Sequence, residues 1–350
     1  MQVRQAVLLM GGRGTRMFPL TATTPKGLLP VAGLPFVDYQ IRLLASVGVE
    51  EVFLAIGTHL LVAWERYAEG RDDPVVRVAV EEAPLDTAGC VVEILDRLDD
   101  RFLVLNGDVV LEADLAGFLA GAPDAAAATL ALVPVADPSA YGVVVTGPDG
   151  YVDQFVEKPP PGTEPTNTVS AGIYVLQRSA LEPYERGRLS FERVVWPALA
   201  ERRRLAAVTI DGHWLDIGIP EMYLETTGAV LTGATTLHHP EGRHRVAPGA
   251  VMEGDHAGAW STIGSGAVVE RGAVIEEAIV LPGARIGSHA VVRRAIVGWD
   301  AVVGADAIVT GASMIGAGAV VGDGCELAHG VRIAPGAELQ PGSVTFSPPK

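Results

Sequence analysis

The sequence predicts an α/β domain with a mostly parallel sheet over residues 1–235, followed by a linker and a parallel β-helix over residues 236–350. Two patterns indicate this. In the first part, short apolar runs alternate with segments of helical spacing, which is typical of a parallel sheet covered by helices. From about Gly233, glycine becomes frequent and aliphatic residues recur at every sixth position, which is typical of a β-helix. The length of 350 residues also predicts more than one hydrophobic core.

The elements of the first domain are predicted from periodicity and from glycine or proline stops. The run Gln5–Met10 has the length of a buried strand, and Phe36–Val47 has apolar residues at helical spacing with Gly48 as its stop. The further predictions are a strand at 52–56, a helix near 60–68, a strand at 75–80, a helix at 91–98, a strand at 102–105, a strand within 124–135, a hairpin joining 141–145 to 151–156, and a strand at 169–176. Ligands of such sheets bind at the carboxyl ends of the strands, so we expect the functional site there.

The second domain is predicted from a six-residue period that survives many repeats. The aliphatic positions are Ile263, Val269, Ile275, Ile286, Val292, Ile315, Val321, Leu327, Ile333 and Leu339, with small residues four places later at Ala267, Ala273, Ala319 and Ala337. The pattern resembles the left-handed β-helix of nucleotidyltransferases and acyltransferases. His289 and His329 could serve acyl transfer as histidine bases. We instead expect this domain to be structural and to assemble a homo-oligomer.

The turn after the first strand is rich in glycine and arginine. The segment from Gly11 to Arg16 contains three glycines and two arginines. Glycine lets backbone amides approach a ligand closely, and consecutive amides form a concavity that suits phosphate oxygens. It is not a Walker A loop, because the lysine arrives only at Lys26. The turn therefore predicts a site for a phosphate chain, with a tight surface loop as the alternative.

A longer stretch decides between these interpretations. Residues 11–21, 25–31 and 33–35 closely resemble the signature of the nucleotidyltransferases that make nucleotide-sugars from a nucleoside triphosphate and a sugar 1-phosphate. The resemblance implies a Rossmann-like catalytic domain, a triphosphate held by the glycine-rich turn and its arginine, and a phosphate contact from Lys26. One departure is Gly27, because the family usually has a second proline there.

Two aspartates at predicted strand ends indicate a magnesium site. Asp108 follows the apolar run Phe102–Leu105, and Asp216 lies in the segment His213–Gly218. Magnesium prefers one or two protein carboxylates and completes its shell with phosphate oxygens and water. From the residues alone, both aspartates are open to interpretation as turn or helix-capping residues. The resemblance implies that both bind the same Mg²⁺ ion.

Three further motifs match the same family. The segment Glu81–Gly89 resembles its Glu-x-x-Pro-Leu-Gly-Thr-Ala loop, which contacts the base and ribose, with Asp86 in place of the usual glycine. The segment Glu157–Pro159 resembles its sugar-phosphate motif, in which an acid accepts hydroxyl hydrogens and a cation pairs with phosphate. The strand at 169–176 resembles its Asn-Ala-Gly-Ile-Tyr strand, with Ser170 in place of asparagine.

The resemblance implies a role for each matching residue. The expected catalytic residues are Arg16, Lys26, Asp108, Lys158 and Asp216. The residues expected to bind the nucleoside triphosphate, including its base and ribose, are Leu9, Gly11, Gly12, Gly14, Thr15, Arg16, Glu82, Thr87 and Ala88. The expected sugar-phosphate residues are Gly142, Glu157, Lys158 and Ser170, and the expected Mg²⁺ ligands are Asp108 and Asp216.

The substrate preference is predicted from one further segment. Ser190–Arg193, leading to Trp196-Pro197, is closer to the mannose-1-phosphate guanylyltransferase branch than to the thymidylyl or uridylyl branches. This favours GTP and mannose 1-phosphate as substrates, with a nucleotide-sugar and pyrophosphate as products. The alternatives are glucose 1-phosphate with UTP, dTTP or ATP, a sugar-like cyclitol phosphate, a non-catalytic regulatory subunit, or a β-helix acyltransferase.

Composition narrows the class of protein. The net charge of −16 argues against a general nucleic-acid binder. No apolar run reaches the ~20 residues of a membrane helix, and a signal-peptide pattern is missing, so we expect a cytoplasmic enzyme without a membrane partner. Cys90 and Cys325 fit reduced thiols. His238, His239, His244 and His256 match no zinc pattern and predict a solvated linker.

Overall fold

The computed structural model describes residues 3–235, 237 and 242–345. By contacts the chain divides into two compact units, Met1–Gly12 with Val37–Trp214 and Arg13–Phe36 with Leu215–Lys350. The part of the signature that follows Gly12 therefore belongs to the second unit, together with the β-helix. The predicted domain boundary after residue 235 stays a prediction. No helix within the described ranges is long and apolar enough to cross a membrane.

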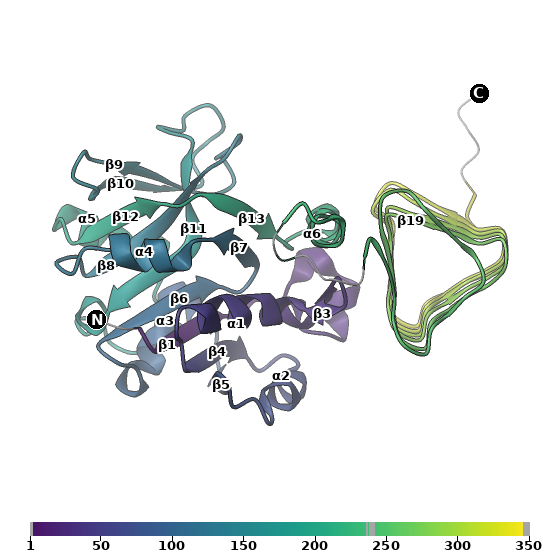
Figure 1. The fold of residues 1–350 in the computed structure, drawn as a ribbon, viewed down its shortest axis with the longest axis horizontal. Coiled ribbons are helices and arrows are strands. Elements are labelled where there is room, and N and C mark those ends of the chain that lie inside the picture. The colour runs from purple at the N-terminus through teal and green to yellow at the C-terminus, as the bar shows by residue number, and fades with distance from the viewer. Residues whose placement is uncertain (1–2, 236, 238–241, 346–350) are drawn as a thin grey trace. The chain divides into compact units, whose positions relative to one another are not determined.

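The first unit alternates strands and helices as the periodicity predicted (Figure 1). Its strands are β1 (Gln5–Leu9), β4 (Glu51–Gly57), β5 (Val75–Glu81), β6 (Arg101–Asn106), β7 (Val109–Ala113), β8 (Ala128–Pro134), β9 (Gly142–Thr146), β10 (Val152–Glu157), β11 (Thr168–Gln177), β12 (Leu205–Thr209) and β13 (Gly212–Asp216), the last of which crosses into the second unit. Its helices are α1 (Phe36–Ser46), α2 (Leu61–Ala68), α3 (Asp86–Glu93), α4 (Leu115–Gly121) and α5 (Trp196–Glu201).

The main sheet of this unit is mixed. Strands β6, β1, β4 and β5 are neighbours and run parallel, whereas β11 joins them to β8 and β9 through antiparallel pairs. The predicted hairpin is confirmed, because β9 and β10 pair antiparallel and Gly147 N donates to Tyr151 O at 2.9 Å in the turn between them. Strands β7 and β13 form a separate two-stranded sheet that the sequence did not predict.

The helix predicted at 91–98 begins earlier than expected. Helix α3 starts at Asp86 and ends at Glu93, and a 3-10 turn follows at Leu95–Arg97. A carbonyl from a distant segment explains this, because Leu189 O accepts from Ala88 N at 2.9 Å and from Gly89 N at 3.0 Å. These first-turn amides have no partner inside the helix, so a partner more than a hundred residues away allows the helix to start there.

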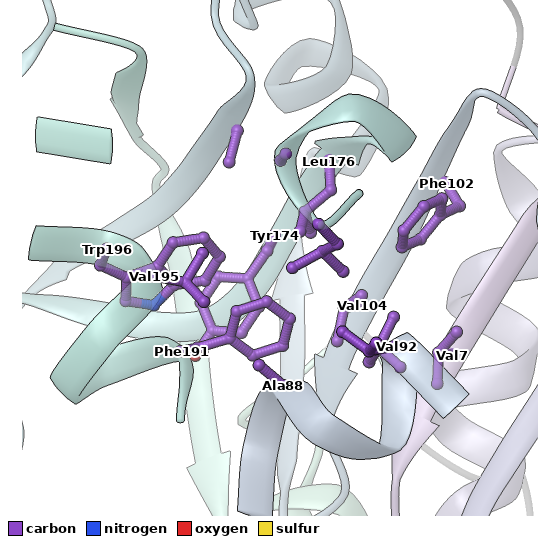
Figure 2. Packing of buried hydrophobic residues seen from close by; sticks show 14 of the residues in the cluster. Val7, Ala88, Val92, Phe102, Val104, Tyr174, Leu176, Phe191, Val195 and Trp196 are labelled. Carbon is purple, nitrogen blue, oxygen red and sulfur yellow. The ribbon is translucent and has the colours of Figure 1, made fainter. Parts of the chain in front are cut away.

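An aromatic group anchors the core of the first unit. Phe191 and Trp196 stack with ring centroids 4.5 Å apart, and Tyr174 of β11 lies 5.0 Å from Trp196. Figure 2 shows these three rings grouped with Val195 beside Ala88. Large aromatic side chains contribute strongly to core stability. The segment that follows Ser190 is thus held firmly next to the start of α3.

The second unit includes β2 (Pro30–Val31), β3 (Leu34–Pro35) and α6 (Pro220–Thr232). The Tyr223 hydroxyl of α6 donates to Pro30 O at 2.7 Å. A side-chain carbon built on Gly33 would lie 1.4 Å from the Arg245 guanidinium, and one built on Gly228 would lie 2.4 Å from Trp260 Nε1. The β2–β3 hairpin, α6 and the first β-helix coil therefore pack closely, and a larger residue at either glycine would displace the side chain that lies against it.

The β-helix has three parallel sheets that form a triangular coil in Figure 1. Its strands are β14 (His244–Val246), β15 (Val251–Met252), β16 (Asp255–Ala257), β17 (Ser261–Ile263), β18 (Val268–Val269), β19 (Val274–Glu276), β20 (Ile279–Val280), β21 (Arg285–Ile286), β22 (Val291–Arg293), β23 (Ile296–Val297), β24 (Val302–Val303), β25 (Ile308–Val309), β26 (Met314–Ile315), β27 (Val320–Val321), β28 (Glu326–Leu327), β29 (Arg332–Ile333) and β30 (Glu338–Leu339). The predicted aliphatic positions through Leu327 lie in one buried core, and Ile333 and Leu339 pack against it.

The six-residue period has gaps at two corners of the coil. Val280 and Val297 are buried core residues, but they follow Ile275 and Val292 by five positions rather than six. One residue fewer at these corners shifts the phase of the pattern. The shift explains why the six-residue period did not predict these two valines as core residues.

Two histidines correct the prediction of a solvated linker. His244 and His256 belong to β14 and β16, and their rings stack with centroids 4.8 Å apart. Both Nδ1 atoms lie within hydrogen-bonding distance of the buried Ser261 hydroxyl, at 3.0 and 2.7 Å. Burial and the neighbouring His244 lower the pKa of His256. His238 and His239 lie outside the described residues.

Candidate active site

Four parallel strands bring their carboxyl ends to one edge of the first unit. These ends are Leu9 of β1, Gly57 of β4, Glu81 of β5 and Asn106 of β6. A side-chain carbon built on Gly57 would lie 3.6 Å from Gly11 O, which places the start of the glycine-rich turn beside β4. Gly11 and Gly12 are exposed there, and a carbon built on Gly12 would meet no atom of the described residues within 4 Å. The start of the glycine-rich turn is thus open to solvent at this strand edge.

The turn that presents Asp108 is packed tightly against β1. Gly107 N donates to Leu9 O at 3.1 Å, and a side-chain carbon on Gly107 would lie 2.4 Å from the same oxygen. The neighbouring Asn106 lies against Gly172, where an added carbon would be 2.8 Å from Asn106 Nδ2. Asp108 itself is half-buried. The backbone around this carboxylate therefore has little freedom, while the side chain stays accessible.

Glu81 lies at the same strand edge and was not among the residues expected to bind the nucleoside triphosphate, whereas its exposed neighbour Glu82 was, and the role of Glu82 stays a prediction. Glu81 Oε2 accepts from Leu85 N at 3.0 Å, and a carbon built on Gly11 would lie 2.7 Å from Glu81 Oε1. Burial, with a smaller contribution from the Asp86 charge, raises the pKa of Glu81. Two signals could have indicated it, because Glu81 aligns with the glutamate that begins the Glu-x-x-Pro motif and it is the last residue of β5, at the edge that strand ends form.

Asp86 keeps the backbone conformation that a glycine would adopt. Its φ is 67°, in the left-handed region, where aspartate is tolerated better than most residues. Its Oδ1 accepts from Thr87 N at 2.9 Å, and its Oδ2 lies 3.5 Å from Arg188 Nε. The departure from the family's glycine therefore preserves the shape of the loop.

Replacing Asp86 tests this explanation. We expect Asp86→Gly to stay within about 1 kcal/mol of the native free energy of unfolding, because glycine adopts this φ without strain. We expect Asp86→Ala to be about 1–2 kcal/mol less stable than Asp86→Gly, because a β-carbon is disfavoured in this region. Urea unfolding of the two variants measures the difference. Equal stability of the alanine and glycine variants would contradict it.

The predicted base-binding residues Thr87 and Ala88 make their polar contacts within the protein. The Thr87 hydroxyl donates to Glu192 Oε2 at 2.7 Å and accepts from Phe191 N at 3.0 Å. Ser190 also donates its hydroxyl to the same Glu192 oxygen, at 2.8 Å. The amides of Thr87 and Ala88 are occupied by Asp86 and Leu189. The roles assigned to these two residues stay predictions, and the hydrogen bonds favour a shaping role for their polar groups.

The predicted sugar-phosphate motif lies at the open end of the hairpin. Gly142 pairs with Glu157 across β9 and β10, and a carbon on Gly142 would be 3.1 Å from Glu157 Oε2. Lys158 Nζ lies 3.3 Å from Glu157 Oε1, with most of the lysine side chain exposed. Lys158 also has a φ of 48°, and its amide donates to Tyr141 O at 3.0 Å. Arg203 and Arg294 have similar positive φ values, so this conformation does not distinguish Lys158, and the role assigned to it stays a prediction.

Ser170 contributes to a network beneath this motif. Burial and then the charge of Glu192 raise the pKa of Tyr174, and hydrogen bonds from Ser170 and Asn106 oppose the shift. Sequence reasoning also missed an aromatic pair, in which Trp214 lies 4.8 Å from Tyr141 edge to face and donates its Nε1–H to Ala171 O at 3.3 Å. Tyr141 precedes Gly142 in the chain and Ala171 follows Ser170, so this aromatic pair lies beside residues of both predicted sugar motifs.

The second unit brings together the other predicted residues. Gly14 has a φ of 60° and its carbonyl accepts from the Thr21 hydroxyl at 2.9 Å, while Thr15 and Arg16 begin the 3-10 turn that follows. A carbon built on Gly14 would lie 3.2 Å from Lys26 Cβ. The predicted phosphate-binding residues 14–16 and 26 are therefore neighbours.

Asp216 and Arg16 converge over Gly218 in the same unit. The Asp216 carboxylate accepts from Gly218 N at 2.5 Å, and its carbonyl accepts from the Thr226 hydroxyl at 3.0 Å. A carbon built on Gly218 would lie 2.9 Å from Asp216 Oδ1 and 3.2 Å from Arg16 Nη2. Glycine at 218 leaves the space that both charged groups use.

The donor chemistry of these two aspartates fits magnesium. Both are half-buried carboxylates with hard oxygen donors, each in a turn held by backbone hydrogen bonds or close packing. Within the described parts of the chain, no three His, Cys, Asp or Glu side chains gather as a metal cluster. Mg²⁺ needs no such cluster, since it is usually held by one or two carboxylates and by substrate phosphates.

Known proteins of similar sequence and fold include several nucleotidyltransferases. The mannose-1-phosphate guanylyltransferase of Mycobacterium tuberculosis is 34% identical over 282 residues, covering 75% of this chain and 76% of that protein. The mannose-1-phosphate guanyltransferase of Candida albicans is 35% identical over 247 residues, covering 68% and 67%. The crystal structure of HddC from Yersinia pseudotuberculosis superposes with a TM-score of 0.55 at 26% identity, covering 64% of this chain and 98% of HddC.

Family models give the assignment for the chain. A model described as GMPPB C-terminal domain matches residues 242–343, which contain the β-helix. A model described as Nucleotidyl transferase matches residues 5–233, which is more than half of the sequence. This match over more than half of the sequence shows that the chain belongs to the nucleotidyl transferase family.

Proposed function

We propose that this nucleotidyltransferase forms GDP-mannose and pyrophosphate from GTP and mannose 1-phosphate. The observation that supports it most is the likeness, at about 35% identity, to several proteins named mannose-1-phosphate guanyltransferase. A structure of HddC in complex with GMP-PN supports a guanine nucleotide as well. The hydrogen bonds from Ser190 and Thr87 to Glu192 tie the segment that indicated GTP to the predicted base loop.

The carboxylate of Glu81 supports guanine as the base. Guanine presents N1–H and N2–H₂ as adjacent donors, and a carboxylate accepts two hydrogen bonds side by side. Uracil and thymine offer only one ring N–H on the corresponding edge. Glu81 Oε1 lies beside Gly11 at the strand edge, and Glu81 begins the segment that resembles the family's base-contacting loop.

The chemistry that we propose is a single in-line displacement. An oxygen of the sugar 1-phosphate attacks the α-phosphorus of the triphosphate, a new P–O bond forms, and the bond to the β-phosphate oxygen breaks to release pyrophosphate. Such reactions depend mainly on positioning and on neutralising phosphate charge. Arg16 and Lys26 hold the leaving phosphates, Lys158 holds the attacking phosphate, and Glu157 accepts from sugar hydroxyls.

We propose that Asp108 and Asp216 each supply a carboxylate to Mg²⁺. The bound ion supplies charge neutralisation at the phosphates. The tight packing around Gly107 and the Gly218 N–H bond to Asp216 hold these carboxylates in place. We also propose a homo-oligomer built through the β-helix and a cytoplasmic location, which the two buried free cysteines favour.

A substrate matrix tests the specificity. Five nucleoside triphosphates are each combined with mannose, glucose and cyclitol 1-phosphates, and pyrophosphate release is measured at equal concentrations. We expect GTP with mannose 1-phosphate to give the highest kcat/KM, and a Glu81→Gln variant to lose part of its preference for GTP over UTP. A higher kcat/KM for another pair in the native enzyme would overturn the proposed specificity while leaving the family assignment intact.

A further inference from the structure

A fully buried amide lies directly beneath the turn that presents Asp108. Gln40 of α1 has no exposed surface, which is rare for glutamine. Its Nε2 donates to Asn106 O at 2.7 Å and to Val109 O at 2.6 Å. Both partners are carbonyls, so only the NH₂ end of the amide can face them. The two carbonyls bracket Gly107 and Asp108 on either side.

This amide completes the restraint of the turn. On its other face, the Gly107 amide is bound to Leu9 O, and no room remains for a side chain there. The turn connects β6, which ends at Asn106, to β7, which begins at Val109. Contacts from β1 and from α1 therefore fix the backbone on both sides of Asp108, while the Asp108 side chain remains half-exposed.

The choice of glutamine is explained better by position than by stability. Gln40 Oε1 is buried and has no hydrogen-bond partner among the described residues, and an unsatisfied buried acceptor costs about 1–3 kcal/mol. An apolar side chain of similar volume would have no unpaired oxygen, but the Asn106 and Val109 carbonyls would then lose their hydrogen bonds to this side chain. Glutamine at position 40 leaves one buried oxygen unpaired, and its NH₂ group forms two hydrogen bonds to the Asp108 turn.

We infer that Gln40 is a positioning residue, which holds the Asn106–Val109 turn so that the Asp108 carboxylate is oriented for the metal and the substrate phosphates. The inference rests on the proposed metal role of Asp108. Residues that orient metal ligands from outside the coordination shell typically change metal affinity or activity by about 10–100-fold when replaced. Gln40 acts through the backbone of the turn and touches no substrate in this scheme.

The test compares Gln40→Met, Gln40→Glu, Asp108→Ala and Leu44→Ala in the full-length enzyme. We expect Gln40→Met to raise the half-saturating Mg²⁺ concentration about tenfold and to lower kcat, with KM for the sugar 1-phosphate changed less than about twofold. Mn²⁺ binding, followed by electron paramagnetic resonance with a non-hydrolysable GTP analogue, should weaken in parallel. Gln40→Glu keeps the side-chain length and, when protonated, one donor, so its effect should be smaller.

Leu44→Ala is the matched control, because Leu44 is equally buried in α1, one turn further on. Its cavity should cost about 2–5 kcal/mol of stability without changing Mg²⁺ dependence or Mn²⁺ affinity. If Gln40→Met proves insoluble, Gln40→Glu decides alone by the same measurements.

The outcomes separate this inference from the proposed function. A raised Mg²⁺ requirement in the Gln40 variants, with activity lost in Asp108→Ala, supports the positioning role. Unchanged Mg²⁺ dependence in the Gln40 variants, with activity still lost in Asp108→Ala, overturns it and leaves the proposed function standing. Native Mg²⁺ dependence and Mn²⁺ affinity in Asp108→Ala would overturn the metal role, and the inference with it.

Discussion

Replacing Asp108 by alanine is expected to lower kcat by at least about 100-fold, because removing a metal ligand should cost more than removing a residue that only orients one. The carboxylate is half-buried and its backbone is fixed by Gly107 and neighbouring strands, so little stability should be lost. Pyrophosphate release at saturating substrates and Mg²⁺ measures the rate, and circular dichroism with thermal unfolding checks the fold. Asp216→Ala should behave similarly.

A nearby aspartate provides the matched control for Asp108. Asp114 caps α4, and its Oδ1 accepts from Gly117 N at 2.8 Å. Asp114→Ala should lose about 1 kcal/mol of stability, as loss of a helix cap usually does, while kcat stays near the native value. Near-native turnover in a folded Asp108→Ala enzyme would reject the metal role assigned to Asp108.

The parts of the fold that follow local periodicity could be predicted from the sequence. Parallel strands β1, β4, β5 and β6 are apolar runs, and the β-helix core repeats over many coils. Elements that depend on distant partners could not be predicted in this way. Helix α3 starts at Asp86 because Leu189 caps it, and β7 pairs with β13. Neither partner is visible in the local pattern.

The residues of the candidate site also divide into those that the local sequence predicts and those that depend on distant contacts. Motif residues such as Asp108, Lys158 and Asp216 were found because their sequence neighbours match a family signature. Gln40 has no such signal, because a polar residue beside the apolar stripe of a helix normally indicates a solvated face. It is buried only because the β6–β7 turn lies over it, which is a non-local contact.

Asp86 and Ser170 show why departures from a motif need a structure. Asp86 stands where the family usually has glycine, but its left-handed backbone and its bond to Thr87 N preserve the loop. The serine at 170 interacts with Tyr174, so its hydroxyl is engaged within the protein. Neither substitution by itself argues for a different substrate.

Replacing Gly107 by alanine should destabilise the protein strongly for the addition of a single carbon. The added carbon would lie 2.4 Å from Leu9 O and 2.5 Å from Met10 Sδ. The methionine can move, but the carbonyl belongs to β1, which pairs with β4 and β6 in the middle of the sheet. Overpacking of this kind typically costs about 1–3 kcal/mol, and the rigid backbone partner puts this site at the upper end.

Gly107→Ala should also lower kcat, because relief of the contact must move either the end of β1 or the turn that presents Asp108. Gly57→Ala is its matched control for stability, since an added carbon there would be 3.6 Å from Gly11 O, an ordinary contact at a neighbouring strand end. Urea unfolding of both variants and the Mg²⁺ dependence of pyrophosphate release measure the two effects. If Gly107→Ala unfolds at the native urea concentration with native kcat, the turn is more plastic than its packing indicates, and the rigidity assigned to the Asp108 site is wrong.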